Sequence, residues 1–123
     1  MSLLLELGPS NTTTWVLRIT GEALDARAAA KCHLDRLDSE WHESLGRVLR
    51  LVVDLGGLHA LDASGLAWIV QLYQRLGPGS RMMFCGANAA IRRLLEETWL
   101  DEIFPVLDDL PPDFTVEFRL RIR

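Results

Sequence analysis

The chain has 123 residues, of which 49% are hydrophobic, and it carries a formal net charge of -4 with an isoelectric point near 5.3. This length suits a single domain, residues 1–123, with one compact core, and it leaves no room for a second catalytic domain. The acidic balance argues against nucleic acid as the main partner, because phosphate binding requires a basic surface. We therefore expect a small domain that binds another protein.

Cysteine and histidine usage indicates neither disulfides nor a metal site. Cys32 and Cys85 form no CxxC motif, and His33 and His42 would lie on opposite sides of one helix. No phosphate-cradling glycine motif occurs, so we expect no cofactor. No charged and apolar leader opens the chain, and its apolar runs are far shorter than the roughly 20 residues of a membrane span. These features predict a cytoplasmic protein without direct membrane insertion.

The first half of the sequence predicts two strands, one long helix and a third strand. Residues 1–8 and 13–20 flank the turn-forming GPSN, which is typical of a hairpin. Apolar residues at helical spacing predict one amphipathic helix over 26–45. The nearly continuous apolar run 48–55 predicts a strand buried on both faces, which Gly56-Gly57 ends in a loop.

Helix and strand signals alternate in the second half. A helical apolar face begins at Leu66 and stops at GPGS, and residues 81–85 predict another buried strand. Asn88 is a candidate N-cap for a third helix. At the C-terminus, residues 114–123 alternate strictly between apolar and polar, which predicts a half-buried strand. This order of elements predicts an α/β domain in which helices cover a mixed sheet.

The segment Asp62-Ala63-Ser64-Gly65 joins the buried strand to the following helix. Asp62 and Ser64 are both candidates to cap that helix, an interaction that contributes about 0.5 to 2 kcal/mol. The same geometry accommodates a phosphate, because a helix N-terminus presents N–H groups and partial positive charge. Ser64 lacks the flanking glycines of a nucleophile elbow, so a serine hydrolase is not supported. We predict Ser64 as a candidate phosphorylation site and no catalytic residue.

Four tryptophans fall in or beside apolar patterns: Trp15, Trp41, Trp68 and Trp99. Core packing is the default for such residues. Trp68 lies off the apolar face of its helix, so we expect it to be exposed and available to a partner.

Three segments together resemble a STAS domain of the bacterial anti-sigma factor antagonist family, over about residues 11–107. They are GEALD, VVDLGGLHALDASGLAWIV and ANAAIRRLLEETWLDEIFPV. The resemblance implies a STAS-like fold, with a central mixed sheet and helices packed largely on one side. It also implies partner switching without catalysis by this chain. In that family the antagonist binds an anti-sigma factor that is itself a serine kinase, frees a sigma factor, and is then phosphorylated.

The sequence departs from this family in two places. The family's usual phosphoacceptor is the hydroxyl residue directly after the aspartate of an Asp-Ser-[Ser/Thr]-Gly segment, and that position is Ala63 here. Either Ser64 is used after a one-residue shift, or phosphorylation does not control the domain. The family often ends in a further helix, whereas the extension 111–123 is predicted to form an extra strand.

Three hypotheses for the partner follow. The first is an anti-sigma factor docked on the helix start and a neighbouring loop, through Asp62, Ala63, Ser64, Gly65, Leu66, Trp68, Gly57 and His59. The second is the ATPase of a lipid-handling ABC transporter, of which this chain would be a cytosolic STAS subunit with no need for a hydroxyl group at Ala63. The third is a second copy of the chain, with the C-terminal strand mediating a homodimer or larger assembly.

Overall fold

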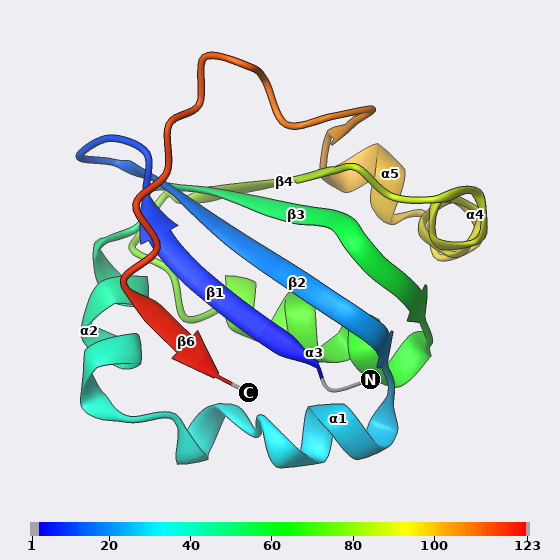
Figure 1. Cartoon of the computed structure of the whole chain (residues 1–123), viewed down its shortest axis with the longest axis horizontal. Helices are drawn as coiled ribbons and strands as arrows, with labels where there is room; N and C mark the ends of the chain where they lie inside the picture. The colour runs from blue at the N-terminus through cyan, green and yellow to red at the C-terminus, as the bar shows by residue number, and fades with distance from the viewer. Residues whose placement is uncertain (1–2, 123) are drawn as a thin grey trace.

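The sheet of this computed structural model, which describes residues 3–122, has six strands (Figure 1). They are β1 (Leu4–Pro9), β2 (Thr14–Leu24), β3 (Arg50–Leu61), β4 (Arg81–Cys85), β5 (Val106–Leu107) and β6 (Leu120–Ile122). Their spatial order is β5-β4-β3-β2-β1-β6. Strands β2 to β5 pair in parallel, and β1 pairs antiparallel with both β2 and β6. The predicted mixed sheet is confirmed.

The helices cover one face of this sheet. They are α1 (Ala26–Lys31), α2 (Ser39–Arg47), α3 (Ala63–Tyr73), α4 (Ala89–Glu97) and α5 (Leu100–Ile103), with a short 3-10 turn η1 (Leu34–Arg36). Their buried side chains join strand residues such as Leu17, Val53 and Phe84 in one hydrophobic core. Figure 1 shows α1, α2 and α3 on the same side of the strands. The predicted packing of helices largely on one side is therefore confirmed.

The C-terminal segment covers the opposite face. A second, smaller cluster contains Val16, Val52 and Cys85, and the tail packs on it through Leu110, Phe114, Val116 and Phe118. The guanidinium of Arg18 lies 4.7 Å from the ring centroid of Phe118, and its Nε is 3.1 Å from Oδ2 of Asp54. These contacts bury strand residues that the helices do not reach.

The predicted strand over 114–123 is right only near its end. Residues 120–122 form β6, whereas the segment before them crosses the sheet obliquely, from the β5 edge to the β1 edge (Figure 1). Its backbone nevertheless contacts β1, because the N–H of Glu117 donates to Pro9 O at 3.3 Å. A Cβ on Gly8 would lie 2.2 Å from the carbonyl oxygen of Glu117, so this crossing requires glycine there.

The single helix predicted over 26–45 is wrong, because the chain breaks it twice. Asp38 starts a new helix by accepting a hydrogen bond from the N–H of Trp41 at 3.3 Å, and His33 similarly precedes η1. The apolar residues of the predicted helix nevertheless reach the core, as Leu34, Trp41 and Leu45 show. Side-chain capping groups inside the apolar pattern thus set the breaks.

The loop predicted at Gly56-Gly57 is also wrong, since β3 continues through both glycines to Leu61. Arg18 pairs with Asp54 but Thr20 pairs with Gly57, so β3 carries one extra residue, a β-bulge. Oδ1 of Asp54 accepts a hydrogen bond from Gly56 N at 3.0 Å within this bulge. Strand β2 likewise runs through GEAL, beyond its predicted end. The predicted first strand included Met1 and Ser2, which lie outside the described residues.

Candidate functional site

Helix α3 begins at Asp62-Ala63-Ser64, and Asp62 is its cap. Oδ1 of Asp62 accepts a hydrogen bond from the N–H of Gly65 at 2.9 Å, and its carbonyl accepts from Leu66 N at 2.9 Å. Ser64 is therefore the second residue of the helix and is exposed. The first N–H groups of an α-helix have no acceptor within the helix, so this end offers hydrogen-bond donors beside the serine hydroxyl.

Gly65 fixes where the helix starts. A Cβ at this position would lie 2.0 Å from the carbonyl oxygen of Leu24 and 2.8 Å from Cδ1 of Leu61. Any other residue would push the first turn of α3 away from the ends of β2 and β3. Gly65 is buried, and its role is to bring the backbone of α3 close to the sheet.

Around this helix start, small and polar residues are exposed. They include Gly57 and His59 on β3, and Asp62, Ala63, Ser64 and Ala67 at the start of α3, and together we call them the α3-start surface. The carbonyl of His59 accepts a hydrogen bond from Nδ2 of Asn88 at 2.8 Å. Oδ1 of Asn88 in turn accepts from Ile91 N at 2.9 Å. The predicted cap of α4 thus also ties that helix to the end of β3.

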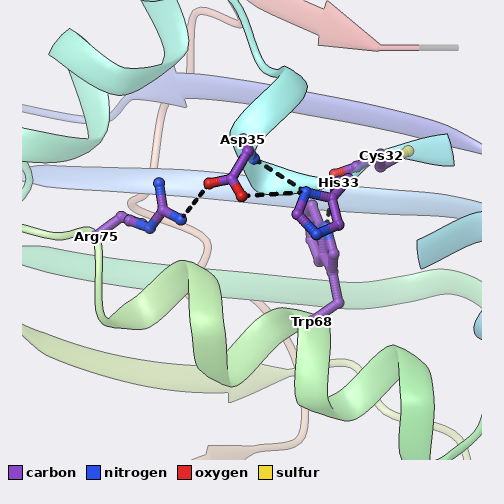
Figure 2. A network of polar contacts seen from close by, with 5 residues as sticks. All are labelled: Cys32, His33, Asp35, Trp68 and Arg75. Atoms are coloured by element: carbon purple, nitrogen blue, oxygen red, sulfur yellow. Dashed lines mark hydrogen bonds and ion pairs between the residues drawn. The ribbon is translucent and has the colours of Figure 1, made fainter. Parts of the chain in front are cut away.

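The prediction that Trp68 is an exposed contact is wrong. Its side chain is 3% exposed, and its Nε1 donates a hydrogen bond of 2.7 Å to the carbonyl of Cys32 (Figure 2). Leu66 is 4% exposed, so it too packs inside the domain. The connection from α1 to η1 covers α3 on the side away from the sheet. The spacing of apolar residues in α3 indicates only the helix face that meets the sheet. It cannot indicate that another segment, the connection from α1 to η1, covers the other side of the helix.

A polar network ties the end of α3 to the same connection (Figure 2). Arg75 donates to Oδ1 of Asp35 at 3.0 Å, and Nδ1 of His33 accepts from the N–H of Asp35 at 3.3 Å. The hydrogen bond from Arg75 lowers the pKa of the Asp35 carboxyl. These groups are exposed and lie outside the α3-start surface, so we read the network as a structural link.

Neither cysteine contributes a reactive thiol to this surface, because both are buried. Burial raises the pKa of the Cys32 thiol, and burial together with the charge of Asp54 raises the pKa of Cys85 to about 12. Among residues 3–122, no group of three His, Cys, Asp or Glu side chains is placed to hold a metal ion. Nor does any helix in that range have the length and apolar character to cross a membrane. What this site offers is a contact surface with one exposed hydroxyl group.

Comparison with known families identifies the fold. The model of the STAS domain family matches residues 9–111, and the chain belongs to that family. No curated protein matches the sequence significantly.

Three solved structures illustrate the similarity. An anti-sigma factor antagonist from Mycobacterium paratuberculosis is 23% identical with a TM-score of 0.62, and the match covers 87% of each chain. The anti-sigma factor antagonist SpoIIAA in its unphosphorylated form is 19% identical with a TM-score of 0.66, over 89% of this chain and 90% of that one. The STAS domain of a SulP transporter from Vibrio cholerae is 15% identical with a TM-score of 0.54, over 81% and 76%. At these identities the similarity shows the shared fold alone.

Proposed function

We propose that this chain is a protein-binding regulator that docks an anti-sigma factor with serine kinase activity through the α3-start surface. The observation that supports this proposal is the exposed Asp62-Ala63-Ser64 segment at a helix N-terminus, in a STAS domain whose solved neighbours include anti-sigma factor antagonists. The exposed small residues of this surface, Gly57, Ala63 and Ala67, leave room for a partner to approach closely. Gly65, Leu66 and Trp68 are excluded from the contact because they are buried.

Ser64 is the proposed acceptor of a phosphate, in place of Ala63. A phosphoryl group brings about -1.5 to -2 charges, which the helix N-terminus accommodates in the free domain. In a complex the same charge would be buried at the contact, where its desolvation is costly. Phosphorylation would therefore leave the fold intact and release the partner.

The first test identifies the partner and the modified residue together. The purified domain serves as bait in a lysate of its host, and retained proteins are identified by mass spectrometry. The captured kinase is then incubated with ATP and three forms of the domain: the wild type, Ser64→Ala, and Ser64→Ala combined with Ala63→Ser. The proposal expects phosphate on the wild type and none on Ser64→Ala. Labelling of the double variant alone would show that the kinase reads only the usual acceptor position.

A second test addresses the surface independently of phosphorylation. Ala67→Glu places a charge on an exposed position of α3, and Ala30→Glu places the same charge on an exposed position of α1 as the matched control. We expect the first variant to lose affinity for the partner at least about tenfold and the control to retain it. Equal affinities would exclude the α3-start surface.

The alternative function is docking on the ATPase of an ABC transporter as a cytosolic STAS subunit. Ala63 favours this alternative, because it is exposed and lacks the hydroxyl group that a kinase switch ordinarily uses. The SulP transporter domain shows that the same fold also occurs in transport proteins. Capture of a Walker-motif ATPase by the bait would support this branch, and the Ala67→Glu comparison would apply to it unchanged.

A further inference from the structure

Trp99 is an exposed tryptophan in an unfavourable backbone conformation. It lies between α4 and α5, is 67% exposed, and has a φ of 63°. This left-handed region is unfavourable for a bulky side chain, and glycine would adopt it freely. The exposed indole gains little from the core. Packing and backbone conformation therefore both disfavour tryptophan at this position, which points to a role outside the folded chain.

Trp99 lies in an acidic stretch of the chain that carries two more exposed apolar residues. Ile103, the last residue of α5, is 67% exposed, and Leu107 on the edge strand β5 is 36% exposed. The sequence from 96 to 113 contains seven Asp and Glu residues and no Lys or Arg. Of these, Asp108 pairs with Arg92, and a depression beside Ile103 is also lined by Arg50 and Arg81, so the acidic charge is strongest around Trp99. We call Trp99, Ile103 and Leu107, with the exposed Asp101 and Glu102, the α5 patch. The α5 patch suits a partner surface that is apolar at its centre and basic at its rim.

The opposite edge of the sheet has the complementary chemistry. A depression of about 200 Å³ is lined by residues of β6 and of the chain from α1 to α2, and we call it the β6 depression. Figure 1 shows these two segments of the backbone near each other. The lining of the depression includes the basic residues Lys31 and Arg36 and the half-buried apolar residues Leu37 and Ile122. Arg121 also lines it, and its Nε already donates to Oε2 of Glu6 at 3.0 Å. The acidic residue in the lining, Asp38, already accepts the capping hydrogen bond of α2.

We propose that the occupant of the β6 depression is a second copy of this chain, which inserts Trp99 of its α5 patch. The acidic, apolar patch of one copy meets the basic, apolar depression of the next. Because β5 and β6 are the two edges of the sheet, the contact joins different surfaces of the two copies. A symmetric contact of two α5 patches would instead oppose like charges. Such head-to-tail contacts join subunits into closed rings or open chains, and they use a surface different from the α3-start surface.

Sedimentation velocity of the full chain over a wide concentration range tests this assembly. The wild type is expected to form oligomers that grow with concentration and weaken with added salt. Trp99→Gly removes the indole, and Arg36→Glu reverses a charge of the β6 depression. Each variant alone is expected to lose association at least about tenfold. Leu49→Ala is the control, because Leu49 is an exposed apolar residue outside both surfaces, at 45% exposure.

Mixing the two variants separates the head-to-tail arrangement from any symmetric one. Trp99→Gly keeps an intact β6 depression, and Arg36→Glu keeps an intact α5 patch. Their mixture should therefore form a one-to-one complex that cannot grow further. Melting temperatures confirm that each variant is folded. A wild type that stays monomeric at every concentration, oligomers that survive Trp99→Gly, or a mixture that forms no complex would each overturn the proposal.

Discussion

Adding one methyl group to a helical glycine is expected to have opposite effects in α3 and α2. The Cβ of Gly65→Ala would lie 2.0 Å from the carbonyl oxygen of Leu24, against 3.4 Å for the closest ordinary contact. The position of this Cβ is fixed by the backbone of α3, and the oxygen that it meets belongs to the backbone of β2. The first turn of α3 or the end of β2 must therefore shift. Such overpacking typically costs about 1 to 3 kcal/mol, and alanine's higher helix propensity returns about 1. We take the upper end of the cost and expect a net loss of about 2 kcal/mol.

Gly46→Ala in α2 is the matched control. No atom lies within 4 Å of a Cβ built on Gly46, so only the helix propensity changes. We expect this variant to gain about 0.5 to 1 kcal/mol. Urea denaturation of the wild type and both variants measures the free energy of unfolding. Equal or greater stability of Gly65→Ala would refute the close approach of α3 to Leu24, and with it the stated position of the α3-start surface.

Three further predictions concern individual side chains. Asp62→Ala should cost about 1 kcal/mol in urea denaturation, because Gly65 N loses its acceptor, whereas Asp62→Asn should cost much less. Trp68→Phe keeps most of the buried ring but leaves the carbonyl of Cys32 without its donor, so it should cost about 1 to 3 kcal/mol in the same assay. Cys85 has a pKa raised from 9.0 to about 12, so the folded state holds its proton while the unfolded thiol ionises. Unfolding free energy should thus be unaffected by Cys85 below pH 9 and should fall as the pH rises toward 12. Cys85→Ala should flatten this slope, and an unchanged slope would contradict the burial of the thiol.

Much of the fold was predictable from local pattern. The run before Gly56 identified the first half of β3, and the apolar spacing around Ile69 identified α3. Asn88 identified the start of α4, since its side chain caps the helix as predicted. In each case the signal lies within a few residues of the element that it specifies, and tertiary contacts reinforce it.

Where the sequence pattern gave a wrong prediction, the property in question depended on long-range contacts. Trp68 was expected to be exposed because it lies off the sheet-facing stripe, yet the α1 to η1 connection covers it. Trp99 was expected to pack in the core, yet it is 67% exposed. The glycines at 56 and 57 suggested a loop, but pairing with β2 absorbs them as a bulge. None of these outcomes is encoded in the spacing of apolar residues along one element.

The candidate site shows the same division. The sequence by itself determined that an aspartate, an alanine and a serine stand at a helix start, because capping is local chemistry between a side chain and the next turn. Only the tertiary structure decided which of the neighbouring residues face solvent. That depended on Gly65 meeting Leu24 and on a second layer of chain over α3, both of which join residues about 40 positions apart. Exposure is a property of the assembled layers, and so a single helix cannot specify it.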